Sequence, residues 1–388
     1  MTIPQEIVDE ILGEVDDIES LKSCALVALK FCTPSQRILL HSLTVESGYK
    51  DSHPSNYTAV LRLLTESPHI ALYIRELTIK LPAGLTALQD IETLRWILAK
   101  MTKVQHCTLT VKYIQDTRWS SLNPILSSTI LDFITKQRLR SITLACLPDI
   151  PLPVLLRLIT STSRLDCAFL GGDLQGKKLQ DLERLRPPSL DCLILDSDSR
   201  YVTDLLARPE SEARTRNLIR LAMPYENSMV FIRRAAVTLK QIRLDCRGLD
   251  IQSKIIPSEF SPLPSLRSVE IKLSFWNRDE PWLIDLISCI LTANSTATIE
   301  EVIVAYGIDY SPPVDISESF RSFLTKLEDL PFQHPAAPRI RWRLAYANVD
   351  VAQLVNLIKI KMPRLHATGR LVFESYDLCW SSEWLAAS

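Results

Sequence analysis

The chain has 388 residues, of which 46% are hydrophobic and 23% charged, so it has ample apolar material for a folded core. This length exceeds what one ordinary core holds and predicts either several globular domains or one elongated repeat array. The 44 basic and 45 acidic side chains give a formal net charge of -1, and no long run of one charge occurs. The charge balance therefore does not indicate a nucleic acid or an anionic membrane as a partner.

The cysteines and the first residues indicate a reducing compartment. The nine cysteines are an odd number, lie far apart and include no Cys-x-x-Cys pair, which argues against a disulfide framework and a zinc knuckle. Residues 1–17 lack the basic and apolar regions of a secretory signal, and no run of about 18 apolar residues occurs. We expect a cytoplasmic or nuclear protein without a membrane span.

Residues 2–45 predict three short helices. The segments Thr2–Gln5 and Thr33–Gln36 fit the capping box, in which a hydroxyl and an amide side chain bond the free N–H groups of a helix start. Pro34 stands at the favoured first helical position. Apolar residues recur at helical spacing after the first cap and again after Glu19. So short a segment with so much apolar surface should bury one face on a partner or on the rest of the chain.

From residue 69 onward, segments of the form Leu-x-x-Leu-x-Leu recur, with other apolar residues replacing some leucines. The middle residues of nine clear copies are Leu77, Cys107, Ile142, Ala168, Leu193, Leu221, Ile242, Val269 and Val302. Successive copies are 21 to 35 residues apart, and helical patterns lie between them. Short strands that alternate with helices at this period predict an irregular α/β solenoid of the leucine-rich-repeat type, a horseshoe.

If the strands form the concave wall of a solenoid, the residues between the apolar positions point into it. Six of them are candidates for binding a partner protein: Lys80, Thr110, Arg243, Asp245, Glu270 and Lys272. Their mixed charges suit a polar protein surface, where charge complementarity sets specificity. A solvated face without a ligand explains the same residues equally well.

The sequence thus divides into a helical segment at 1–46, a connecting segment at 47–68 and a solenoid at 69–388. At the far end, Trp380 and Trp384 predict a cap over the last repeat, whose core would otherwise be exposed. A partner-binding tail is the alternative for these two residues.

The strongest indication of an enzyme is the segment Gly171–Lys178, which fits the Gly-x4-Gly-Lys pattern of a phosphate-binding loop. Lys178 stands where a hydroxyl must ligate magnesium, and the strand at 193–196 is already explained by the repeat. The six histidines are scattered without metal-ligand spacing. We expect no catalytic site, no cofactor and no metal, and nucleotide hydrolysis is a remote alternative.

The N-terminal segment resembles the F-box of fungal F-box proteins that carry degenerate leucine-rich repeats. The likeness begins with Ile3-Pro4-x-Glu6-Ile7 and continues through apolar positions to Leu43. It implies docking on the Skp-type adaptor of a cullin-RING ubiquitin ligase, while the repeats hold an unknown protein substrate. The residues that the resemblance assigns to the adaptor contact are Pro4, Ile7, Ile11, Leu12, Leu21, Val27 and Phe31.

Two features depart from the family pattern. Phe31 stands where the family commonly has Trp, and Leu29-Lys30 replaces a basic pair. The position after the strand, usually Asn or Cys in such repeats, holds Pro82, Lys112, Leu147 and Arg247. These turns must therefore satisfy their backbone groups in another way. The expected function is a substrate-recruiting adaptor, and the alternative is a non-catalytic interaction scaffold in which the N-terminal helices only cap the solenoid.

Overall fold

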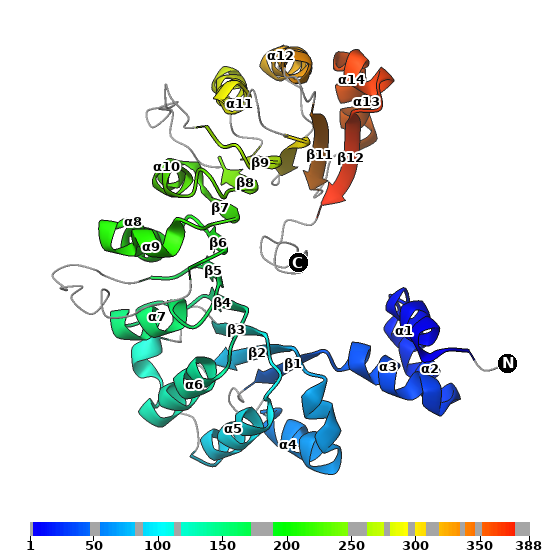
Figure 1. Ribbon diagram of the computed structural model, residues 1–388, viewed down its shortest axis with the longest axis vertical. Coiled ribbons are helices and arrows are strands. Elements are labelled where there is room, and N and C mark those ends of the chain that lie inside the picture. The colour runs from blue at the N-terminus through cyan, green and yellow to red at the C-terminus, as the bar shows by residue number, and fades with distance from the viewer. Residues whose placement is uncertain are drawn as a thin grey trace. The chain divides into compact units, whose positions relative to one another are not determined.

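The protein is an α/β protein of parallel strands separated by helices (Figure 1). The computed structural model describes residues 3–46, 55–81, 88–111, 118–171, 189–246, 262–274, 280–293, 299–307, 318–333, 338–345 and 351–376. The chain divides into two compact units. Unit 1 comprises Met1–Pro188 and Asp198–Val202, and unit 2 comprises Ser189–Ser197 and Thr203–Ser388.

Unit 1 begins with three helices and continues as alternating strands and helices. The helices of the N-terminal segment are α1 (Gln5–Gly13), α2 (Ile18–Val27) and α3 (Leu29–Leu39). The strands are β1 (Ser42–Glu46), β2 (Glu76–Leu81), β3 (His106–Val111), β4 (Ser141–Ala145) and β5 (Arg164–Ala168). Between them lie α4 (Tyr57–Glu66), η1 (Pro68–Leu72), α5 (Leu88–Lys100), η2 (Trp119–Ser121), α6 (Pro124–Lys136) and α7 (Leu152–Ile159).

Unit 2 repeats the alternation of strand and helix. Its strands are β6 (Cys192–Leu195), β7 (Arg220–Pro224), β8 (Gln241–Asp245), β9 (Ser268–Ser274), β10 (Glu301–Gly307), β11 (Arg339–Ala345) and β12 (Leu371–Tyr376). Its helices are η3 (Pro209–Ser211), α9 (Glu212–Thr215), α10 (Tyr225–Arg234), α11 (Glu280–Ala293), α12 (Glu318–Gln333), α13 (Val351–Lys361) and α14 (Pro363–Ala367). Helix α8 (Arg200–Ala207) lies where the two units divide.

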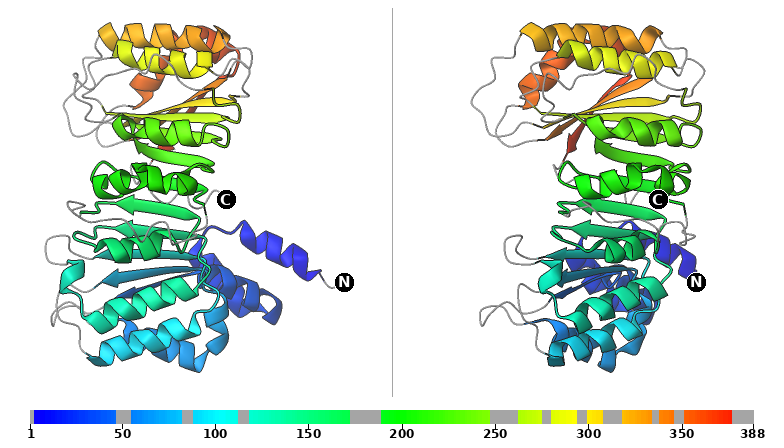
Figure 2. Two further views of the ribbon diagram at one scale, coloured as in Figure 1. Left: turned by 60° about the vertical axis from the view of Figure 1, so that its left-hand side comes forward. Right: turned by 90° about the vertical axis from the view of Figure 1, so that its left-hand side faces the viewer.

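Strands pair in chain order and in parallel, from β1 to β5 in unit 1 and from β6 to β12 in unit 2. Helices cover one face of each sheet (Figures 1 and 2). The repeated apolar positions stand in register, as in Leu77, Cys107 and Ile142, and all three are buried. Because side chains alternate across a strand, one face of each strand builds the core shared with the helices.

The sheet starts earlier in the chain than the repeat pattern indicates. Strand β1 lies within the segment predicted as helical, and it pairs with β2 over Ser42 to Glu46. Helix α4, from the predicted connecting segment, packs against α5 and buries Tyr57, Val60 and Leu64. The first strand and helix of the array therefore come from residues before 69.

In the repeat copy that forms β5, the predicted apolar positions are three residues too late in the chain. The prediction aligned Ala168 with Ile142, whereas the observed register pairs Ile142 with Leu165. The first position of this copy is Thr162, which is buried, and its hydroxyl donates to the carbonyl oxygen of Arg140 at 2.8 Å. A hydroxyl at a position expected to be apolar accounts for the shifted frame.

A recurring pair of backbone bonds joins the turns that precede the strands. The carbonyl oxygen of His41 accepts the N–H groups of Arg75 and Glu76 at 2.8 and 3.1 Å. The carbonyls of Arg75 and Gln105 accept two successive N–H groups of the next turn in the same way. In unit 2 this arrangement recurs at Asp191, Ile219, Lys240 and Arg267. This ladder satisfies buried backbone groups without an asparagine side chain.

The turn after β4 is the described example of the position that lacks Asn. Cys146 adopts a left-handed φ of 58°, and its N–H donates to the carbonyl of Ala168 at 2.8 Å. The next residue, Leu147, is buried. The other three predicted positions, Pro82, Lys112 and Arg247, lie outside the described residues. After β4, an inter-repeat backbone bond and an apolar anchor thus replace the asparagine.

Candidate functional site on the N-terminal helices

The three N-terminal helices have a small core of their own. Val8, Leu12 and Leu21 are buried in it, and Val15, Cys24, Phe31 and Leu39 pack around them. Both α1 and α2 pack against α3, and side chains of α1 and α2 share the core. This segment therefore holds its shape through internal contacts, and its remaining apolar side chains are free to face outward.

Helix α1 carries a second apolar stripe that stays about half exposed. Ile7 and Ile11 are 44% and 53% exposed, and Ile3, two residues before the helix, is 54% exposed. Side chains four residues apart lie on one face of a helix, so Ile7 and Ile11 form one outward row. Val8 and Leu12 form the inward row on the same helix.

The junction of α2 and α3 exposes further apolar residues. The second and third helices were predicted to divide at Thr33–Pro34, but α2 ends at Val27 and Ala28 is extended, with φ -157° and ψ 153°. Helix α3 then starts at Leu29. Leu26, Val27 and Leu29 flank this break and are 88%, 76% and 91% exposed.

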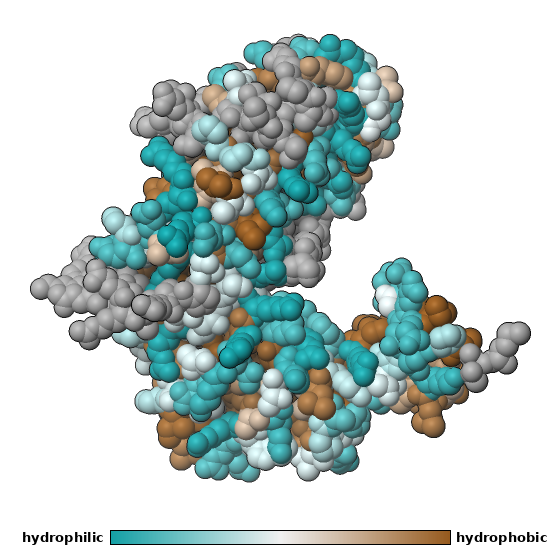
Figure 3. Space-filling view, in the orientation of Figure 1, coloured by the Kyte–Doolittle hydropathy of each residue, from teal (hydrophilic) through white to brown (hydrophobic). Residues whose placement is uncertain are grey.

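We name these side chains the apolar surface. It consists of Ile3, Ile7, Ile11, Ile18, Leu26, Val27 and Leu29. Figure 3 shows brown apolar side chains on the visible face of this segment. Complete burial of one Leu or Ile side chain contributes about 1.5–3 kcal/mol, and surfaces of this kind mark interaction sites.

Pro34 lies inside α3 and links α3 to α1. Proline has no N–H for the carbonyl of Lys30, four residues earlier, and that oxygen accepts a bond from Nε2 of Gln5 at 3.2 Å. Thr33–Gln36 is therefore not a helix start. The predicted cap at Thr2–Gln5 is replaced by Pro4, whose side chain makes no capping bond.

Side-chain capping occurs instead at α2. A carboxylate oxygen of Asp17 accepts the N–H of Ser20 at 2.7 Å. Hydrogen bonding to Ser20 stabilises the charged carboxylate and lowers the pKa of Asp17.

The link between the helical segment and the first repeat runs through the end of α3. The guanidinium of Arg37 lies 5.8 Å from the ring centroid of Tyr73, and the carbonyl of His41 starts the backbone ladder. Contacts at one end of one helix anchor the segment without covering its apolar surface.

The residues assigned to the adaptor contact fall into two groups. Pro4, Ile7, Ile11 and Val27 are exposed, and Phe31 is half-buried. Leu12 and Leu21 belong to the internal core, so they support the surface and do not form it. Sequence reasoning missed Ile3, Ile18, Leu26 and Leu29, although the four-residue spacing in α1 indicated part of this row.

Of the six candidates on the strand face, Lys80 and Thr110 belong to unit 1. Nζ of Lys80 lies 3.3 Å from a carboxylate oxygen of Glu46 on β1, and both residues are partly exposed. Thr110 is half-buried on β3. These two side chains remain accessible to a partner.

The other four candidates, in unit 2, are buried. Arg243 on β8 lies 2.8 Å from Glu270 on β9, with side chains 1% and 2% exposed. Asp245 and Lys272 are buried as well. In this conformation none of the four offers its charge to a partner.

The ion pairs continue towards the end of unit 2. Arg343 lies 3.2 Å from Glu270 and 3.0 Å from Glu374, and Arg341 lies 3.3 Å from Glu374 and 2.8 Å from Glu301. Burial opposes ionisation of Glu374, but bonds from Arg343 and Arg341 outweigh it and lower its pKa. Alternating charges thus link β9 to β12, between neighbouring strands and, for Arg343 and Glu270, across β10.

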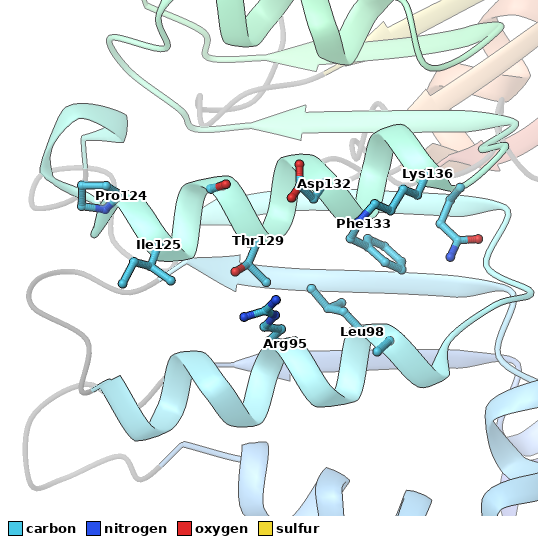
Figure 4. Close-up of a pocket in the computed structure, with 11 residues that line it drawn as sticks. Arg95, Leu98, Pro124, Ile125, Thr129, Asp132, Phe133 and Lys136 are labelled. Carbon is cyan, nitrogen blue, oxygen red and sulfur yellow. The ribbon is translucent and has the colours of Figure 1, made fainter.

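Described residues of unit 1 line two grooves of similar volume. One, of about 560 Å³, lies between α5 and α6, where Arg95 and Leu98 face Thr129 and Phe133 (Figure 4). Its lining mixes apolar, polar and charged side chains. The other, of about 630 Å³, lies beyond the ends of α6 and α7.

The remaining predictions fall largely outside the described residues. Of the segment Gly171–Lys178, the structure describes Gly171 alone, and Trp380 and Trp384 are also undescribed. Within the described ranges, no three His, Cys, Asp or Glu residues gather as metal ligands. In the same part of the chain, no helix has the length and apolar character needed to cross a membrane.

Comparison with known proteins found no family model that matches the chain and no curated protein with significant similarity to it. The fold and the site define its class directly. The chain is an α/β protein of repeated strand and helix units with parallel strands, and its N-terminal three-helix segment exposes an apolar surface.

Proposed function

We propose that the chain is a substrate-recruiting adaptor of a Skp-cullin-RING ubiquitin ligase. In this proposal the N-terminal helices are an F-box-like segment, and the repeats form an irregular leucine-rich-repeat horseshoe that holds a protein substrate. The observation that carries the proposal is the apolar surface on a segment with its own core. The resemblance of Ile3-Pro4-x-Glu6-Ile7 to the F-box opening names a Skp-type adaptor as the occupant.

The exposure of these side chains suits docking. Leu29 is 91% exposed, so the free chain has little contact to lose when the residue binds a partner. Burying several such side chains together would give the apolar centre that stable interfaces share. On the substrate side, Lys80 and Thr110 would contact the target, whereas the buried pair Arg243 and Glu270 would shape the wall.

Co-purification of the full-length chain with a fungal Skp-type adaptor tests the proposal. We expect Ile11→Glu to reduce adaptor binding by about tenfold or more, because a carboxylate would be buried in an apolar interface. Ile125→Glu is a matched control, since Ile125 is also a helical isoleucine and is likewise 53% exposed. Leu29→Glu is a second variant with little expected effect on folding.

The proposal fails if the unchanged chain forms no complex with the adaptor. It fails equally if Ile11→Glu and Leu29→Glu bind the adaptor as tightly as Ile125→Glu does. Circular dichroism of each variant verifies that the helices remain folded.

A non-catalytic interaction scaffold is the second candidate function. The contact of Arg37 with Tyr73 favours it, because this contact ties α3 to the first repeat. A scaffold predicts no adaptor complex. It also predicts that Arg37→Ala lowers the stability of the first repeat, measured by hydrogen exchange of β2.

A further inference from the structure

The groove of about 630 Å³ in unit 1 is strongly cationic. It lies where α6 and α7 end and where β4 and β5 begin. The residues that line it include Arg138, Arg140 and Arg157 and five residues with hydroxyl side chains, and no Asp or Glu is among them. Three positive charges around one cavity favour an anionic ligand.

Two of the three guanidiniums have no counter-charge among the described residues. Arg138 and Arg140 are exposed, and neither forms an ion pair within the described part of unit 1. Nη2 of Arg157 lies 3.8 Å from Asp132, and both side chains are about half exposed. A pair this long and this exposed neutralises little of the charge of Arg157.

Helix ends explain only part of this cluster. Arg157 lies in the last turn of α7, where a cation complements the partial negative charge of the helix terminus. Arg138 and Arg140 follow α6 in the turn that leads into β4. Their charges therefore need a different explanation.

The backbone that carries Arg140 is held in place by several bonds. Its N–H donates to the carbonyl of Gln105 at 2.7 Å, and its carbonyl accepts the N–H of Arg164 at 3.1 Å. The same carbonyl accepts the hydroxyl of the buried Thr162 at 2.8 Å. The hydroxyls of the lining already donate to backbone carbonyls, as Thr162 does to Arg140, so they hold the rim in place. The arginine side chains are then the donors that a preorganised frame offers to an anion.

We propose that this groove binds a phosphorylated side chain of a partner peptide. A phosphate carries close to two negative charges and three acceptor oxygens, enough for the forks of Arg138, Arg140 and Arg157, whereas one guanidinium suffices for a carboxylate. The charges form one cluster on a chain of formal net charge -1, which favours a peptide over a nucleic-acid backbone. This binding goes beyond ligase assembly and does not depend on an adaptor.

Calorimetry with the full chain tests the groove. The probes are the peptide Ala-Gly-Ser-Gly-Ala with its serine phosphorylated, the same peptide unmodified, a version with glutamate at that position, and inorganic phosphate. We expect the phosphorylated peptide to bind at least about tenfold more tightly than the other two peptides. Phosphate should compete with it, which locates the recognition in the phosphoryl group.

Two variants attribute the binding to this groove. We expect the double variant Arg138→Gln with Arg140→Gln to weaken binding of the phosphorylated peptide by about tenfold or more. Arg62→Gln should not change the affinity, because Arg62 is an exposed arginine of α4 paired with Glu66. Equal affinity of the double variant and Arg62→Gln would overturn the proposal, as would tighter binding of a single-stranded oligonucleotide than of the phosphorylated peptide.

An independent signal comes from His106, the first residue of β3. Nδ1 of His106 lies 2.6 Å from Oγ of Ser141, the residue after Arg140. Burial lowers the pKa of His106, Arg164, Arg140 and His41 lower it further, and Glu76 opposes them. A bound phosphate should therefore raise this pKa in an NMR titration, and an unchanged pKa on saturation with the phosphorylated peptide would contradict binding at this place.

Discussion

At the residue scale, Pro34 shows how a side chain of another helix can replace a missing backbone N–H donor. The carbonyl of Lys30 lost its partner within α3 and gained the side chain of Gln5 on α1. Sequence reasoning took Pro34 as a helix start because proline favours the first turn. A proline inside a helix leaves one carbonyl without its helical donor, and here a side chain distant in sequence supplies one.

A double-mutant cycle measures this bond. Gln5→Ala should destabilise the helical segment by about 0.5–1 kcal/mol, because the Lys30 carbonyl loses its donor. In a Pro34→Ala background the same change should have a smaller effect, since the alanine N–H restores the bond within α3. Hydrogen exchange of α3 amides reports both values. If Gln5→Ala destabilises the segment equally with and without Pro34→Ala, the bond from Gln5 does not compensate for the proline.

His106 makes part of the stability depend on pH. Its pKa is lower in the folded chain than the ordinary 6.5, so the unfolded chain binds the proton first as the pH falls. The contribution of neutral His106 to the free energy of unfolding is complete above about pH 6.5. It decreases as the pH falls from there to the pKa of His106 in the folded chain. We expect His106→Gln to flatten this part of the stability profile.

Arg140 is one cause of that lowered pKa. Removing its charge in Arg140→Gln should raise the pKa of His106 towards its ordinary value, which an NMR titration of the free protein measures. Arg62→Gln is again the control with no expected change. A pKa that stays the same in Arg140→Gln would show that burial and Arg164 account for the shift without Arg140.

At the element scale, the strands were predictable because each has the same local pattern. Leu193, Leu221 and Ile242 mark neighbouring strands of unit 2 and stand in register as their spacing indicates. The prediction failed where a tertiary bond replaced an apolar contact, as at Thr162. It also failed at Ala28, where the helical pattern continues through a break in the backbone.

The pair of Arg243 and Glu270 joins β8 to β9, which stand in register at these two residues. Arg243→Met should destabilise unit 2 by about 3 kcal/mol, because it leaves a buried carboxylate with fewer partners. Adding Glu270→Gln should recover part of this loss. Arg267→Met is the control and should cost about 0.5 kcal/mol or less, since Arg267 and Glu300 are exposed and 3.7 Å apart.

Hydrogen exchange of the β8 and β9 amides would measure these differences locally, which avoids assuming that the two units unfold together. If Arg243→Met and Arg267→Met have the same effect, the buried pair does not stabilise this part of the sheet. Glu270 is also paired with Arg343, so Glu270→Gln weakens that second pair and limits the stability that the double variant can recover.

At the scale of the whole molecule, the order of residues was enough to predict the alternation of strand and helix and the side of each strand that faces the core. These properties follow from apolar residues at short, repeated spacings, which act locally along the chain. It also indicated an N-terminal segment with more apolar side chains than three short helices can bury. The spacing of apolar residues alone did not show that Leu12 is buried whereas Ile11 is exposed.

Which apolar and charged side chains remain accessible depends on packing between elements. Packing against α3 buried Leu12 and left Ile11 outside, and the same polar pattern is partly open at Lys80 but buried at Arg243. The grouping of Arg138, Arg140 and Arg157 arises because two helices end beside one turn. Accessibility depends on contacts between residues far apart in the chain, and a local sequence pattern does not predict these contacts.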